Sequence, residues 1–298
     1  MLVLGREVGE QTLGPDVRPE GDAFRGPVHT LDPMSPPSAF RWRAGRLEPL
    51  DAEALPSGSP AVADSWLLED GTALGLDAHR DRFLQGVAAR AGTDGAAFWD
   101  AALAALPRTG AWFPRLELAG TTADAPDLAL RVRPAPERVR GITLATHRGA
   151  DPRSAPTIKG PDLDALAAIR ATARTGGVDD VVLLASDGSV AETTTSNLAW
   201  WHGDALCVPD TAIPQLPGVT VGALVVLATA LGIDVRHERV APDDLDGFEI
   251  WALNSLHGIR IVTGWPGGPA PAAEPGRLAT WRRRLDALRR PLPEVMPA

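Results

Sequence analysis

Lys159 is the only lysine among the 29 lysine and arginine residues of this 298-residue chain. Arginine can replace lysine in most surface roles, but its guanidinium stays charged and cannot attack a carbonyl group as a free amine. A lysine that forms an imine must lose its proton and attack a carbonyl group as a free amine. The retained lysine therefore indicates imine chemistry, although a composition that favours arginine could also leave one lysine by chance.

A cofactor site built around such a lysine needs several further groups. An imine-forming cofactor such as pyridoxal phosphate needs an acid facing its pyridine nitrogen, so that the ring can accept electrons. Its phosphate is best held by a helix N-terminus together with an arginine and hydroxyl groups. Candidates for each of these groups are present.

The elements that must position these residues follow from the periodicity of the apolar residues. Alternation between turn signals predicts strands, whereas spacings of three and four residues with caps predict helices. The predicted helices span residues 76–92, with Asp77 at the cap, 94–106, 162–175, 219–232 and 277–290. The predicted strands lie within 40–50, 61–74, 111–120, 127–134, 141–148, 181–185, 189–201, 205–209, 234–240 and 249–256.

This order of elements predicts a two-domain α+β fold. Residues 1–38 are rich in glycine, proline and aspartate, and we expect an extended N-terminal segment. Residues 39–147 should form a small domain with an antiparallel sheet. The polar segment 148–157 contains two prolines and is expected to be an interdomain linker. Residues 158–298 should form the larger, cofactor-binding domain.

Composition excludes several classes of function. A net charge of −9 and a pI near 5.2 argue against nucleic acid or an anionic membrane as a partner. The histidines and the single cysteine, Cys207, show no metal-ligand spacing, so no metal site is expected. Cys207 should be a buried apolar residue. No apolar run reaches transmembrane length and no signal peptide is recognised, which predicts a cytoplasmic protein.

The motifs from Lys159 to Val262 resemble those of the class IV aminotransferases, the pyridoxal-phosphate enzymes of fold type IV. This family includes branched-chain and D-amino-acid aminotransferases and 4-amino-4-deoxychorismate lyase. The matching segments are IKGPDL at 158–163, Glu192-x-x-x-x-Asn197-Leu198, LPGVT at 216–220 and ALNSLHGIRIV at 252–262, with the His-x-x-Arg helix LDAHRDRF upstream. The resemblance implies a small α/β domain, a larger β-barrel-like domain with helices, and a homodimer.

The resemblance also implies a role for each motif residue. Lys159 would carry the Schiff base and move the substrate proton, and Glu192 would pair with the pyridinium nitrogen. Arg82 would bind the cofactor phosphate together with Val219 and Thr220 at a helix N-terminus. Two alternatives without a function in the site stay open. Glu192 could face solvent from a strand, and Arg82 could be an ordinary arginine on the surface of a helix.

The remaining site residues follow from the same resemblance. Ser255 would add another phosphate contact. Asn254 stands where the lyase branch often has an asparagine near the substrate. Arg115 lies in WFPRLEL, a segment that lines the substrate pocket in relatives, and would bind a substrate carboxylate, although an outward edge-strand arginine is an equal alternative. Asn197 is expected to fix a strand and turn.

The sequence also departs from the family pattern. Val221 stands after LPGVT, where arginine is usual, and the chain contains no tyrosine. Trp66, Trp112 or a water would have to replace the tyrosines that many members place near the substrate carboxylate. These departures leave the substrate open, including the choice between L and D amino acids.

Three functions remain in consideration. Arg115 favours an aminotransferase that acts on an amino acid and a 2-oxo acid. Asn254 and Ser255 favour the lyase, which would release 4-aminobenzoate from aminodeoxychorismate. The missing tyrosines and Val221 favour a catalytically silent relative, whereas the retained Lys159 and Glu192 argue against one.

Overall fold

A five-stranded antiparallel sheet forms the first part of the protein. The computed structural model describes residues 39–51, 58–121 and 126–294, so the predicted segment 1–38 lies outside the described residues. The strand order is β2 (Arg46–Leu50), β1 (Ala39–Arg43), β8 (Pro126–Arg131), β7 (Arg115–Thr121) and β3 (Val62–Ser65). The predicted hairpin at 40–50 is confirmed as β1 and β2, joined by a turn at Ala44 and Gly45, both with positive φ.

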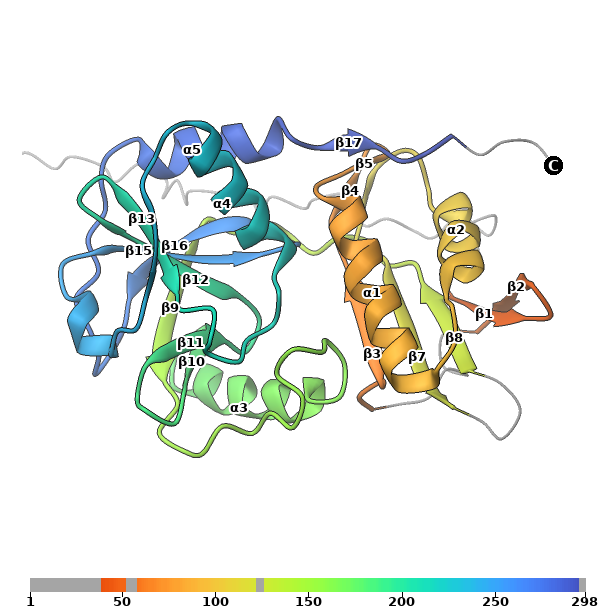
Figure 1. Ribbon diagram of the computed structural model, residues 1–298, viewed down its shortest axis with the longest axis horizontal. Helices are drawn as coiled ribbons and strands as arrows, with labels where there is room; N and C mark the ends of the chain where they lie inside the picture. The colour runs from red at the N-terminus through yellow and green to blue at the C-terminus, as the bar shows by residue number, and fades with distance from the viewer. Residues whose placement is uncertain (1–38, 52–57, 122–125, 295–298) are drawn as a thin grey trace, which may run out of the picture. The chain divides into compact units, whose positions relative to one another are not determined.

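Two helices, α1 (Leu76–Ala91) and α2 (Ala96–Ala105), cover one face of this sheet (Figure 1). Phe83 of α1 and Phe98 and Trp99 of α2 are at most 1% exposed and pack against the apolar residues of β3, β7 and β8. The N-cap of α1 is Gly75, not Asp77, because the left-handed backbone at Gly75 starts the helix without a side-chain cap. Asp77 lies in the first turn, where its charge still suits the helix dipole.

A second, eight-stranded sheet closes on itself to form a barrel. Its order is β11 (Val190–Thr193), β10 (Asp180–Leu184), β9 (Gly141–Thr146), β16 (Gly258–Gly264), β15 (Glu249–Asn254), β12 (Asn197–His202), β13 (Ala205–Pro209) and β14 (Val235–Glu238). β11 also pairs with β12, at Glu192 and Asn197. That pairing joins the strands from β11 to β12 into a ring and places two residues of the predicted motif side by side.

Three helices pack against the barrel. α3 (Leu163–Thr175) contacts β10, α4 (Val219–Ala230) contacts β15, and α5 (Arg277–Asp286) contacts β16 (Figure 1). Trp201 and Trp251 of the barrel pack edge to face against each other and also contact Trp281 of α5. Cys207 is fully buried, as predicted. Among the described residues no helix is long and apolar enough to span a bilayer.

Two features of the topology differ from the predicted grouping of strands. The segment expected to close the small domain forms β9, which pairs in parallel with β10 and β16 of the barrel. A small sheet of β17 (Arg290–Pro291), β5 (Thr72–Ala73), β4 (Leu68–Glu69) and β6 (Ala111–Trp112) joins the last described strand to an early one. The two-domain boundary itself stays a prediction.

Candidate active site

One cavity of about 330 Å³ collects all but one of the predicted site residues. Its wall includes residues from the five-stranded sheet, α1, α4 and the barrel. The predicted residues that line it are Arg82, Arg115, Lys159, Val219, Thr220, Asn254 and Ser255. The structure therefore brings together side chains that lie up to 173 positions apart in the sequence (Arg82 to Ser255, 255 − 82).

Glu192 lines a smaller neighbouring cavity of about 50 Å³. Both cavities share Lys159, Leu163, Thr195 and Leu216 in their walls. Glu192 is 7% exposed, so the alternative of a solvent-facing strand glutamate is wrong. Lys159 lines both cavities, and the charge of Glu192 acts to raise the pKa of its amine.

The backbone fixes Lys159 tightly against β3. Its carbonyl oxygen accepts a hydrogen bond from the Ala63 amide at 2.6 Å. The next residue, Gly160, has φ 147°, and a Cβ there would lie 2.8 Å from the Pro60 carbonyl oxygen and 2.9 Å from the Val62 nitrogen. Only glycine fits this close approach of two backbones. Gly160 therefore determines where the lysine side chain starts.

Gly160→Ala should lower the free energy of unfolding by about 1–3 kcal/mol, because the alanine methyl group meets backbone atoms and the φ angle is unfavourable. Urea denaturation of the two proteins would measure this difference. Gly222→Ala is the matched control, since that glycine lies on the exposed side of α4 with no atom within 4 Å of an added Cβ. It should stabilise the protein by up to about 1 kcal/mol. Equal stability of Gly160→Ala and wild type would contradict the packing described here.

The amine of Lys159 loses its proton more easily than an ordinary lysine. Burial lowers the pKa of Lys159 to about 8, and the charge of Arg82 acts in the same direction. Asp64 and Glu192 oppose this shift. An amine with a pKa of about 8 is neutral far more often near neutral pH than a free lysine, whose pKa is about 10.4. The site thus favours the nucleophilic form of the amine.

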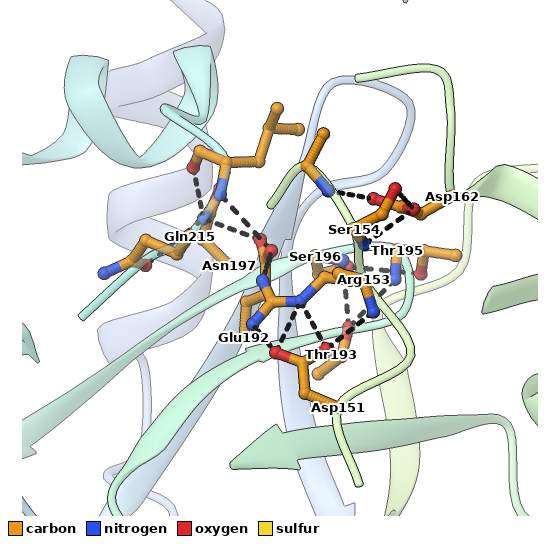
Figure 2. A network of polar contacts seen from close by, with 12 residues as sticks. Asp151, Arg153, Ser154, Asp162, Glu192, Thr193, Thr195, Ser196, Asn197 and Gln215 are labelled. Atoms are coloured by element: carbon orange, nitrogen blue, oxygen red, sulfur yellow. Dashed lines mark hydrogen bonds and ion pairs between the residues drawn. The ribbon is translucent and has the colours of Figure 1, made fainter. Parts of the chain in front are cut away.

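A network of polar contacts holds Glu192 in place (Figure 2). One carboxylate oxygen accepts hydrogen bonds from Arg153 and from the Leu216 amide, the latter at 3.2 Å, and the other accepts from the Asn197 amide at 3.3 Å. Burial raises the pKa of Glu192 to about 7, while Arg153 and Leu216 limit that rise. Near neutral pH the carboxyl group is therefore close to the midpoint between its two protonation states. A cationic partner would stabilise its ionised form.

Arg153 was missed by the sequence analysis. It lies in the segment predicted as a linker, and its guanidinium bridges Asp151, at 2.7 Å, and Glu192 (Figure 2). The side chain is 3% exposed. The same segment is tied down at Ser154, whose hydroxyl donates to Asp162 at 2.7 Å. Part of the predicted linker thus forms a wall of the site.

Asp64 orients Arg82. The two carboxylate oxygens of Asp64 accept hydrogen bonds from Arg82 Nε at 2.9 Å and from its terminal nitrogen at 2.8 Å. Asp64 also lies 2.7 Å from His79 Nδ1. Asp64 is fully buried; burial alone would raise its pKa, but His79 and Arg82 lower the pKa far below its usual value. Asp64 was not predicted, and Arg82 is not a loose surface arginine.

The N-terminus of α4 lines the same cavity and lies beside Arg82, whose guanidinium donates to the Pro217 carbonyl oxygen at 3.1 Å. Gly218 is the N-cap, and Val219 and Thr220 begin the helix, so their amides lack partners within it. A Cβ on Gly218 would overlap Asn197 Oδ1 at 1.7 Å, and one on Gly75 would lie 2.6 Å from Val219. Asn197 thus fixes this turn, as predicted, by donating to the Leu216 carbonyl at 2.9 Å. A helix N-terminus beside an arginine is a favourable anion site.

The predicted substrate residues differ in their surroundings. Arg115 is partly buried in the cavity wall, with Nε 3.0 Å from Glu117, which also binds Arg131. The Asn254 amide donates to Ser196 Oγ at 3.2 Å, and its oxygen accepts from the His257 amide at 2.8 Å.

The expected aromatic substitutes do not lie in the cavity wall. Neither Trp66 nor Trp112 is among the described residues that line it, and Phe113 is the aromatic residue there. Trp66 is instead 1% exposed in the core, against His79 and Trp99. No group of histidine, cysteine or acidic residues within the described part of the chain could hold a metal ion.

Comparison with known proteins agrees with this geometry. The family model for amino-transferase class IV matches residues 61–265. A hypothetical aminotransferase from Mycobacterium tuberculosis in a PLP-bound form is 21% identical, with a TM-score of 0.69 over 84% of this chain and 98% of that one. The branched-chain aminotransferase of Escherichia coli is 16% identical, with a TM-score of 0.70 over 84% and 94% of the two chains. A fold IV transaminase from Curtobacterium pusillum is 20% identical, with a TM-score of 0.69 over 84% of this chain and 98% of that one.

These structures show that the fold is shared, and the barrel-like sheet is part of it. A search of curated proteins found no match.

Proposed function

Because this chain belongs to the class IV aminotransferases, we propose that Lys159 binds its pyridoxal phosphate covalently and moves a proton to and from the substrate. Enzymes of this family use pyridoxal phosphate and act on amino acids and oxo acids. One observation carries the proposal: the only lysine lines the same cavity as Arg82 and the N-terminus of α4, and its pKa is lowered to about 8.

The residues of the site fit this cofactor. Arg82, held by Asp64, and the free amides of Val219 and Thr220 would hold the phosphate. Glu192, a buried acid with a raised pKa, would hold the ring nitrogen in its protonated state. When bound, the cofactor supplies a ring that accepts the electron pair left by the substrate's Cα proton. Lys159 would take that proton as a neutral amine and return it.

Glu192→Gln should keep the cofactor attached to Lys159 but lower kcat by about 10²–10³-fold, because a neutral amide cannot stabilise a charged ring nitrogen. Steady-state rates and the absorbance spectrum of the holoenzyme would measure both effects. Asp151→Asn is the control, since Asp151 contacts Arg153 but not Glu192 and should change kcat by less than about tenfold. An unchanged kcat in Glu192→Gln would remove Glu192 from this role.

The aminotransferase is favoured over the lyase. Arg115 lies in the cavity wall, which supports binding of a substrate carboxylate. Asn254, on which the lyase alternative depended, uses both ends of its amide within the protein. We also propose a cytoplasmic homodimer, as expected from the sequence and the family resemblance.

A panel of substrates tests this proposal directly. The holoenzyme would be mixed with L-amino acids, D-amino acids and aminodeoxychorismate, and the cofactor spectrum followed. We expect an amino acid to change the cofactor spectrum and a 2-oxo acid to reverse that change. Release of 4-aminobenzoate from aminodeoxychorismate would instead establish the lyase. A spectrum unchanged by every compound would favour the silent relative.

A further inference from the structure

Arg260 is a buried arginine in the cavity wall that the proposed reaction does not use. It lies on β16, opposite Ala252 of β15, and is 6% exposed. It lines the same cavity as Lys159. Its terminal nitrogen donates a hydrogen bond to Ser196 Oγ at 2.8 Å, and its Nε has no hydrogen-bond partner. Among the described residues no carboxylate forms an ion pair with Arg260.

The buried carboxylate that acts most strongly on the charge of Arg260 is already hydrogen-bonded to other groups. Asp180 is 1% exposed and accepts hydrogen bonds from the hydroxyls of Thr193, at 2.8 Å, and of Thr194 and Thr195. The Val181 amide adds a further donor at 2.8 Å. Asp180 thus offsets the charge of Arg260 only through space. A buried arginine without a paired carboxylate is costly, and a bound anion would relieve that cost.

Other arginines add to the positive charge around Arg260. Arg170 and Arg174 of α3 line the same cavity, and their charges act on Arg260. Asp179 opposes them, but its carboxylate already accepts two hydrogen bonds from Thr143, both at 2.8 Å. Burial and these neighbouring arginines lower the pKa of Arg260, while Asp180 and Asp179 raise it. The guanidinium nevertheless keeps its charge.

The cavity therefore presents cations from two separate walls. Arg115 of β7 lies in the five-stranded sheet, and Arg133 follows β8 in the same wall. Among the described residues, Glu117 is the carboxylate whose charge acts on both arginines, and Asp164 also acts on Arg115. Arg260 comes from the barrel. A substrate with one carboxylate would engage one wall and leave the other without an anion.

We propose that Arg260, positioned by Ser196, binds a second anionic group of the substrate, so that this enzyme prefers an amino acid or oxo acid with a carboxylate in its side chain. The inference rests on the proposed function for the identity of the substrate, whereas the anion site itself does not depend on it. Arg115 would take the first carboxylate and Arg260 the second. Two charge-assisted contacts from two different elements of the cavity wall would orient such a molecule in the cavity that Lys159 also lines.

Binding of unreactive acids to the holoenzyme tests this proposal without any chemistry. Glutarate and valerate have the same number of carbons, but only glutarate carries two carboxylates. Calorimetry should show that the wild type binds glutarate at least about tenfold more tightly than valerate, which is the value of one charge-assisted hydrogen bond. Arg260→Gln should reduce this preference to less than about twofold, with valerate affinity unchanged.

A matched control separates a specific site from a general positive field. Arg174 lines the same cavity but is exposed, and within the described ranges its side chain donates one hydrogen bond, to the Asp179 carbonyl oxygen at 3.4 Å. Arg174→Gln should keep the glutarate preference. A preference that survives Arg260→Gln, or that falls equally in Arg174→Gln, would overturn the proposal.

A second variant covers the case in which Arg260→Gln does not fold. Ser196→Ala keeps the guanidinium but removes the hydroxyl that positions it, and should weaken glutarate binding severalfold while valerate binding stays constant. Unchanged glutarate binding in Ser196→Ala would then count against the site. Neither acid has an amine or a keto group that could form an imine. A failure of the Lys159 assignment would therefore leave these binding results unaltered, and the two failures can be told apart.

Discussion

Lys159→Arg is expected to abolish covalent binding of pyridoxal phosphate and to lower turnover by at least about 10³-fold, since proton transfer by the lysine alone is worth about 10²–10⁴. The guanidinium keeps the positive charge but cannot shed its proton to attack an aldehyde. Borohydride reduction followed by peptide mass spectrometry would measure attachment. Because the chain has one lysine, a modified lysine peptide can come only from residue 159.

A double variant shows that position, not lysine content, matters. Arg174 lies in the wall of the same cavity, so Arg174→Lys in the Lys159→Arg background restores one lysine nearby. It should recover neither attachment nor turnover, because a lysine at residue 174 would start from α3, whereas Gly160 and the Ala63 amide fix residue 159 beside β3. Full turnover in either variant would exclude the assignment of Lys159.

Asp64→Ala is expected to lower the free energy of unfolding by about 3–5 kcal/mol, the range found when one partner of a buried ion pair is removed. Asp64 is fully buried and holds both Arg82 and His79. Cofactor affinity should fall as well, since Arg82 would lose the contacts that aim it at the phosphate. Urea denaturation and titration of the apoprotein with pyridoxal phosphate would measure the two effects. Asp234→Ala is the control, because its pair with Arg236 is exposed and worth less than about 1 kcal/mol.

The effect of Asp64 should also depend on pH. Its pKa is lowered in the folded protein, so the unfolded chain takes up a proton first as the pH falls. The stabilisation by Asp64 is complete above the unfolded pKa of about 4 and is lost progressively below it. The difference between wild type and Asp64→Ala should therefore stay constant from pH 5 to 8 and shrink in stronger acid. A difference that grew on acidification would contradict this account.

The sequence predicted those site residues whose type and spacing carry a chemical signature. Lys159 was a candidate because it is the one lysine of the chain, and Glu192 and Thr220 became candidates because their motifs resemble those of a known family. Asp64 and Arg153 have no such mark. Each acquires its role only by meeting a partner far along the chain, Arg82 for Asp64 and Glu192 for Arg153.

The fold shows the same division. Helices with clear periodicity were predicted to within a few residues, as α1 and α3 show. The place of β9 depends on parallel pairing with β10 through the crossover helix α3, and strand patterns alone do not reveal which sheet a strand joins. β17 has only two residues, too few for any periodic signal.

The pairing of β17 with β5 has a consequence for how the chain folds during synthesis. Arg289 donates to the Thr72 carbonyl at 2.7 Å, and Leu292, 4% exposed, completes the apolar core beneath α1 and α2. That core cannot be completed until Leu292 has been synthesised, 209 positions after Phe83 (292 − 83). Such distant pairing slows folding. A chain that stops before Arg289 would expose the edge of β5 on the ribosome and invite aggregation.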